Sequence, residues 1–80
     1  MRVIAIDLDA CAAQFPEKVN ELYEDPDNFI VIYTARSEII RTETKNYIAS
    51  LGINYHALVM GKLRADVYID DKNAGGLQWL

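Results

Sequence analysis

The chain has few of the residues that build disulfide frameworks and zinc sites. Its 80 residues include a single cysteine, Cys11, and a single histidine, His56. A lone cysteine cannot form an intrachain disulfide, so nothing points to an oxidising compartment, and cytoplasmic residence is the expected localisation. Without clustered His and Cys ligands, the sequence also argues against a zinc site.

Long apolar runs and an excess of basic residues are also lacking. No run approaches the roughly 20 apolar residues of a membrane span, and the amino terminus lacks the pattern of a signal peptide, so no membrane partner is expected. The formal net charge is -4. Binding to nucleic acid needs clustered Lys and Arg, so this charge argues against nucleic acid as a partner.

Length and composition indicate one small globular domain over residues 1–80. Half of the residues are hydrophobic and a quarter are charged, which is typical of a soluble folded chain. A chain of this size buries only roughly 60% of the surface that its unfolded form exposes. Because such a core is marginal, self-association into a homo-oligomer is an additional source of stability that the sequence leaves open.

Four short apolar runs each lead into polar residues. Because the carboxyl ends of parallel strands meet at one edge of a sheet, where open α/β folds bind ligands, these polar residues are expected to share one crevice. The runs and their polar ends are Val3 to Ile6 before Asp7-Leu8-Asp9, Phe29 to Tyr33 before Thr34, Ala57 to Met60 before Gly61-Lys62, and Val67 to Ile69 before Asp70-Asp71.

Between these runs the sequence predicts two helices, the first from Pro16 to about Tyr23 and the second from Ser37 to Leu51 before Gly52. The alternation of strands and helices predicts an α/β fold, a small three-layer Rossmann-like domain with a mostly parallel sheet of about four strands. The connection to the fourth run is too short for a helical crossover. If that run pairs beside the first, Asp70 and Asp71 lie next to Asp7 and Asp9.

Apolar spacing also predicts which face the second helix buries. The expected buried residues are Ile39, Ile40, Tyr47, Ile48 and Leu51, and the expected outward residues are Arg41, Glu43, Thr44 and Lys45.

Four fragments in this order resemble the signatures of the haloacid dehalogenase-like superfamily, whose members are mostly magnesium-dependent phosphatases. The resemblance spans residues 3 to about 73 and implies a Mg2+-dependent hydrolase that acts on a small phosphorylated metabolite through an aspartyl-phosphate. The fragments are Ile6-Asp7-Leu8-Asp9, Ile32-Tyr33-Thr34-Ala35-Arg36, Gly61-Lys62 and Tyr68-Ile69-Asp70-Asp71.

The resemblance implies a catalytic role for four side chains. Asp7 would be the nucleophile, and Asp9 would protonate the leaving oxygen and later activate water. Thr34 would donate its hydroxyl to the phosphoryl oxygens, and Lys62 would balance the charge of nucleophile and phosphate.

It also implies a substrate-binding set and a metal site. Backbone amides near Leu8 and Ala35 would donate to the phosphate, and Arg36 would contact either the phosphate or a neighbouring subunit. Mg2+ prefers hard oxygen ligands. The carboxylates implied for it are Asp7, Asp9, Asp70 and Asp71, with Asp71 either a ligand or a partner that orients the ligands.

Two departures from the family pattern keep other interpretations open. Ala10-Cys11 replaces a common Gly-Thr pair, and only residues 10–15 separate Asp9 from Pro16, where the family usually carries a longer flap. A catalytically impaired module that binds Mg2+ or phosphate is therefore an alternative. Each Asp alone is also compatible with a turn or helix cap, and a phosphorylated receiver domain fits the order of motifs less well.

Overall fold

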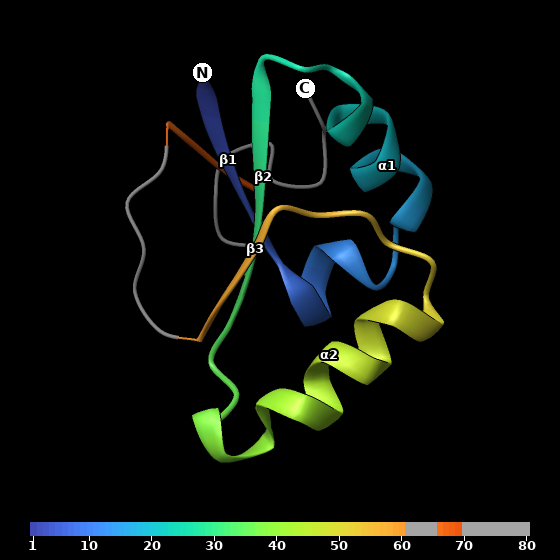
Figure 1. Cartoon of the computed structure of the whole chain (residues 1–80), viewed down its shortest axis with the longest axis vertical. Coiled ribbons are helices and arrows are strands. Elements are labelled where there is room, and N and C mark those ends of the chain that lie inside the picture. Colours follow the sequence, from blue (N-terminus) through green and yellow to red (C-terminus); the bar gives the residue numbers. More distant parts are fainter. Residues whose placement is uncertain (61–65, 70–80) are drawn as a thin grey trace.

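A computed structural model describes residues 1–60 and 66–69. This part of the chain folds into four strands, two α-helices and two single helical turns (Figure 1). The strands are β1 (Arg2–Asp7), β2 (Asn28–Thr34), β3 (Ala57–Met60) and β4 (Val67–Ile69). The helical elements are the π-helical turn η1 (Leu8–Ala12), α1 (Pro16–Glu24), the 3-10 turn η2 (Glu38–Ile40) and α2 (Arg41–Ser50).

The four strands form one parallel sheet in the order β3-β2-β1-β4. Along its length β1 pairs with β2, so that Arg2 lies opposite Asn28 and Asp7 lies opposite Tyr33. On its other side β1 pairs with β4, with Ile6 opposite Ile69. The sequence left open whether the fourth apolar run pairs beside the first, and the pairing of β4 with β1 shows that it does.

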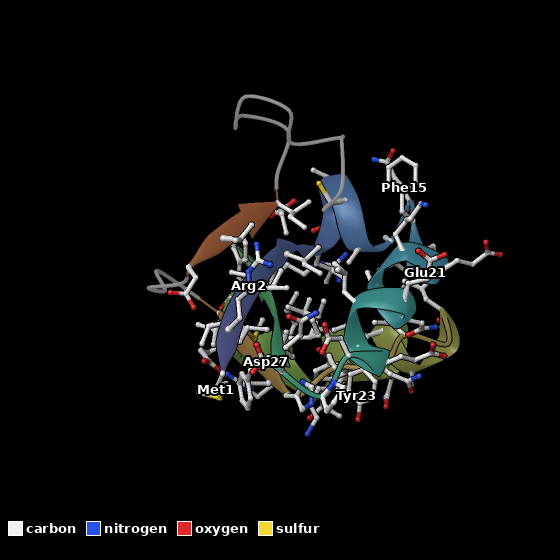
Figure 2. The ribbon with its side chains drawn as sticks, turned by 90° about the horizontal axis from the view of Figure 1, so that it is seen from above. Met1, Arg2, Phe15, Glu21, Tyr23 and Asp27 are labelled. Atoms are coloured by element: carbon white, nitrogen blue, oxygen red, sulfur yellow. The ribbon has the colours of Figure 1, made fainter. Side chains whose placement is uncertain are left out.

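The core lies between the sheet and the helices. Even-numbered residues of β1 and β2, such as Ile4 and Ile30, join Val19 of α1 and Ile48 of α2 in one buried cluster. Both helices therefore pack on the same face of the sheet, as Figures 1 and 2 show. The physical reason is that both crossovers, from β1 to β2 and from β2 to β3, step in the same direction, and right-handed connections then use the same face.

This arrangement is a small α/β fold with a parallel sheet and one layer of helices. The third layer predicted from the sequence is not among the described residues. The central strands are nevertheless buried on both faces, since Ala5 and Val31, which point away from the helices, are buried as well. Continuous apolar runs in β1 and β2 are the sequence counterpart of that burial.

The helix ends follow the predicted local chemistry. Pro16 occupies the start of α1, where its missing amide hydrogen costs nothing. Ser37 caps η2 by accepting a hydrogen bond from the amide of Ile39 at 3.3 Å. Gly52, with φ of 71°, follows the end of α2 in the left-handed conformation that ends helices.

The predicted buried face of the second helix is partly wrong. Ile48 is buried as expected, but Ile39 is 90% exposed and Thr44 is fully buried. Ile39 lies in the 3-10 turn, where the Ile40 amide donates to the Ser37 carbonyl, so the α-helical spacing does not apply there. Thr44 tolerates burial because its hydroxyl donates to the Ile40 carbonyl at 2.8 Å.

His56 joins β2 to the segment that enters β3. Its amide donates to the Ile30 carbonyl at 2.9 Å, and its Nδ1 accepts from the Ile30 amide at 2.8 Å. The ring stacks on Tyr23 and Phe29, with centroid distances of 4.6 and 4.8 Å. One side chain thus continues the strand pairing and closes an aromatic stack at the amino end of the sheet.

We expect His56→Phe to lower the free energy of unfolding by about 1 kcal/mol, because the ring stays in the stack while the Ile30 amide loses its acceptor. His56→Ala removes both interactions and should lose about 1 kcal/mol more. Urea denaturation of both variants checks this. A Phe variant as stable as the unchanged chain would show that the ring contacts alone matter.

Candidate functional site

The candidate site lies at the carboxyl ends of β1 and β2. Asp7 is the last residue of β1, and Thr34 is the last residue of β2. Since β1 and β2 are hydrogen-bonded neighbours, these two side-chain positions lie on adjacent strands at the same edge of the sheet. Both residues therefore end neighbouring strands, as the sequence predicted, and their shared role stays a prediction.

Asp7 is both a strand end and a helix cap. One of its carboxylate oxygens, Oδ2, accepts a hydrogen bond from the Ala10 amide at 2.8 Å, and this caps η1. The capping role that the sequence left open for an isolated Asp is therefore present. It does not exclude a chemical role, because the same bond fixes the direction of the carboxylate.

The link after Asp7 forms a helical turn, which the sequence prediction missed. Residues 10–15 were expected to be only a short link, yet residues 8–12 form the π-helical turn η1, with Leu8 and Cys11 fully buried. The missed signal is an Asp followed by several alanines, which combines a preferred cap with the best helix former. The turn takes the chain out of the strand direction between Asp7 and Asp9, as two cooperating carboxylates require.

Leu8 and Ala35 were predicted to bind substrate through their amides, and both lie at this edge of the sheet. Leu8 begins η1 directly after Asp7, with its side chain in the core as expected. Ala35 follows Thr34 directly in the loop after β2.

Thr34 is 2% exposed, and its Oγ1 accepts a hydrogen bond from the Arg36 amide at 3.2 Å. A hydroxyl that accepts this bond still has a hydrogen to donate. Ser37, not Thr34, caps the following turn. The position and chemistry of Thr34 are thus compatible with a donor to an anion at the sheet edge.

The structure brings Arg36 to Asp9. Arg36 Nη2 lies 2.7 Å from Asp9 Oδ1, and Arg36 Nε lies 3.4 Å from Asp9 Oδ2. The hydrogen bond with Asp9 raises the pKa of the Arg36 guanidinium above its ordinary value, an effect that desolvation partly opposes. Nothing in the sequence links these two residues, because they lie 27 positions apart.

The site is open to solvent. The side chain of Asp9 is 56% exposed and that of Arg36 is 31% exposed.

Three predicted site residues lie outside the described residues: Lys62, Asp70 and Asp71. Within residues 1–60 and 66–69, no group of three or more His, Cys, Asp or Glu side chains could hold a metal ion. Of the predicted magnesium ligands, only Asp7 and Asp9 are described, and Asp9 is paired with Arg36.

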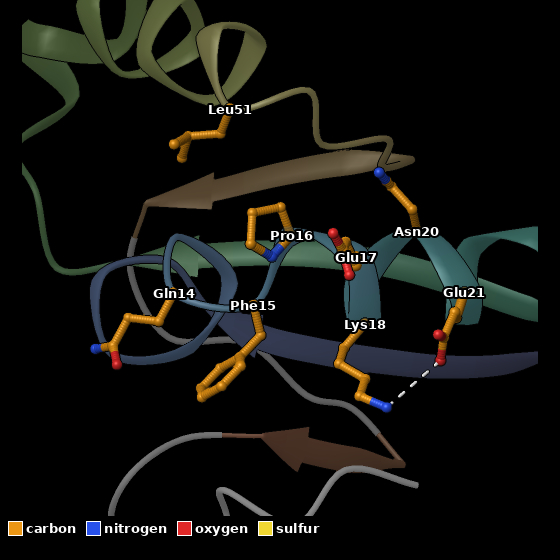
Figure 3. Close-up of a pocket in the computed structure, with 8 residues that line it drawn as sticks. All are labelled: Gln14, Phe15, Pro16, Glu17, Lys18, Asn20, Glu21 and Leu51. Atoms are coloured by element: carbon orange, nitrogen blue, oxygen red, sulfur yellow. Dashed lines mark ion pairs between the residues drawn. The ribbon is translucent and has the colours of Figure 1, made fainter.

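A surface pocket of about 540 Å3 lies elsewhere on the molecule. Figure 3 shows it beside the start of α1, with Leu51 at the end of α2 facing it. Its lining consists of Gln14, Phe15, Pro16, Glu17, Lys18, Asn20, Glu21 and Leu51. None of the predicted site residues that the structure describes lines it, so it is separate from Asp7, Asp9, Thr34 and Arg36.

Comparisons with protein-family models, curated proteins and solved structures found no match to the chain. In the part of the chain that the structure describes, no helix has the length and apolar character needed to cross a bilayer.

Proposed function

We propose that the chain is a Mg2+-dependent phosphomonoester hydrolase of the haloacid dehalogenase-like type. The observation that carries this proposal is the position of Asp7 at the end of the central strand β1, next to β2, which ends at Thr34. On the other side of β1 lies β4, which ends at Ile69, and Asp70-Asp71 follow in the sequence. The parallel order with β1 and β2 central suits a small Rossmann-like fold, whose ligands bind at this edge.

The proposed reaction has two displacements at phosphorus. First, an Asp7 carboxylate oxygen forms a bond to phosphorus while the bond to the leaving oxygen breaks, and Asp9 gives that oxygen a proton. Then a water oxygen bonds to phosphorus, Asp9 takes the proton of that water, and the bond to Asp7 breaks. The products are the alcohol and inorganic phosphate, and both carboxyl groups return to their starting forms.

Charge on the transferring phosphoryl group needs donors around it. Thr34 is proposed to donate its hydroxyl, and backbone amides near Leu8 and Ala35 add further donors. Lys62 is proposed to balance the remaining negative charge.

The donors proposed for the metal are carboxylate oxygens, which match the preference of Mg2+ for hard ligands. Asp7 is the described residue best placed to hold it, with Asp70 and Asp71 proposed to complete the set and Asp9 predicted as a further ligand. When bound, the ion would offset negative charge on the phosphoryl oxygens and align the phosphate for attack.

A second candidate is an impaired module that binds Mg2+ or phosphate in a structural or regulatory role. The observation that favours it is the engagement of both Asp9 carboxylate oxygens by Arg36. If that pair persists with substrate bound, Asp9 has less freedom to serve the leaving group. For the hydrolase we propose a small phosphorylated metabolite as substrate. A cytoplasmic location is proposed for either candidate, and self-association is left open.

Phosphate release from p-nitrophenyl phosphate tests the proposal. We expect release with Mg2+, a loss of about 100-fold or more in EDTA, and recovery when excess Mg2+ is added back, because charge offset by a metal contributes several kcal/mol. Circular dichroism in EDTA checks that the chain stays folded. Release that is insensitive to EDTA would contradict the metal dependence, and no release from folded protein would favour the impaired module.

A further inference from the structure

Arg36 is fixed at several points, although its side chain lies at the surface. Its backbone amide donates to Thr34 Oγ1, and its guanidinium carbon lies 5.1 Å from the centre of the Tyr47 ring. A planar guanidinium over an aromatic face is held by electrostatic attraction to the ring. The loop after β2 and helix α2 therefore both orient the fork of donors that Arg36 presents.

Asp9 is the exposed member of the pair. It belongs to a turn of only five residues, and its side chain is more than half exposed. Among the described residues, the Asp9 carboxylate accepts hydrogen bonds from Arg36 Nε and Nη2. A surface carboxylate on a short turn samples several rotamers unless a partner selects one, so the direction of Asp9 depends on Arg36.

We propose that Arg36 is a positioning residue that holds the Asp9 carboxylate in place for proton transfer at the candidate site. The inference rests on the proposed function, because it assigns to Arg36 a role in the same reaction. It applies to the hydrolytic half, in which the Asp9 carboxylate takes a proton from water as the bond between water oxygen and phosphorus forms and the Asp7–phosphorus bond breaks. A carboxylate is the form of an Asp side chain that can accept this proton.

This role differs from a direct contact with the phosphate, which is one of the two roles that the sequence left open for Arg36. A direct contact contributes to binding, so its loss raises KM or weakens phosphate binding. A positioning role acts through Asp9, so removal of Arg36 lowers kcat. This effect on kcat disappears in a variant whose residue 9 can no longer transfer protons. Effects of two residues that act as one unit are not additive.

The decisive experiment is a double-mutant cycle of Arg36→Ala and Asp9→Asn, measured as kcat and KM for p-nitrophenyl phosphate with Mg2+. We expect Arg36→Ala to lower kcat about 10- to 100-fold, as misplacement of a reacting group does, with KM within about twofold. Asp9→Asn should lower kcat about 100-fold or more. The double variant should match Asp9→Asn.

Two further variants separate positioning from general structure. Arg36→Lys keeps the charge but not the planar fork, so it should recover only part of kcat. Arg41→Ala is the matched control, because Arg41 makes a similar pair with Glu38, at 2.7 Å from both Nε and Nη2, outside the candidate site. It should leave kcat and KM unchanged.

Each contrary outcome has a separate meaning. A raised KM with unchanged kcat in Arg36→Ala would assign Arg36 to the phosphate and overturn the inference, as would an additive loss in the double variant. An equal loss in Arg41→Ala would also overturn it, because the effect would then be structural. No release by the unchanged, folded chain would overturn the proposed function and the inference with it.

Discussion

Asp7→Asn is expected to remove phosphate release while leaving the chain folded. The amide is a poor nucleophile, and the substitution deletes one negative charge at nearly constant volume. We expect the rate to fall by about 1,000-fold or more, since the aspartyl-phosphate can no longer form and only the remaining donors act on the phosphate.

The capping bond of Asp7 makes this variant a clean test. Asn serves as well as Asp at the N-cap of a helix, because its side-chain oxygen can accept the same hydrogen bond. The bond to the Ala10 amide should therefore survive in Asp7→Asn. In Asp7→Ala both the chemistry and the cap are lost, and the free energy of unfolding should fall by about 1 kcal/mol.

The measurement combines phosphate release from p-nitrophenyl phosphate with thermal unfolding for both variants. Asp25→Asn is the matched control, because Asp25 is an exposed carboxylate in the turn after α1 that accepts from the Asp27 amide. It changes the net charge equally and should keep full activity. Full activity in Asp7→Asn would end the nucleophile assignment.

Ile30→Ala should unfold much of the protein or leave it barely stable. Ile30 lies in the middle of the core on β2 and is fully buried. Truncation of a buried Ile to Ala costs about 2–5 kcal/mol. A domain of this size has a total free energy of unfolding of about 4–12 kcal/mol at the usual stability per residue, so the loss is a large share of the total.

Ile39→Ala is the matched control for that prediction. It is the same chemical change on a side chain that is 90% exposed, so it should alter the free energy of unfolding by no more than about 0.5 kcal/mol. Urea denaturation measures both variants. Equal losses at the two positions would contradict the described core and restore the sequence-based prediction that Ile39 is buried.

The sheet was predictable because its strands carry strong local patterns. Short, continuous apolar runs mark parallel strands, and each of the four runs did become a parallel strand, although β3 is only partly buried. The partner of β4 was not fixed by such a pattern. Val67 pairs with Ile4, which lies more than 60 positions earlier in the chain. No local pattern predicts such a partner, so the sequence left the pairing of β4 open.

Two of the errors occur where the backbone departs from regular α-helix. The 3-10 turn η2 shifts the phase before α2, so a single 3.6-residue period from Ser37 to Leu51 misassigned Ile39. The turn η1 was missed because its five residues are too few to show a period.

The candidate site was predictable in part. Asp7 and Thr34 follow from their positions at strand ends, whereas the pair of Asp9 and Arg36 depends on side-chain directions that no spacing rule supplies. The predicted roles of Lys62, Asp70 and Asp71 stay predictions, since these residues lie outside the described part of the chain.

The strand order also predicts a sequence of assembly. β1 and β2 are joined by one helix and can pair early as a local unit, which brings Asp7 and Thr34 together. The pairing of β1 with β4 closes a loop of most of the chain, and contacts of such high sequence separation form slowly because loop closure costs entropy first. A nascent chain would therefore hold Asp7, Thr34 and Arg36 in near-final positions while β1 still has an open edge, and β4 is the element that closes it.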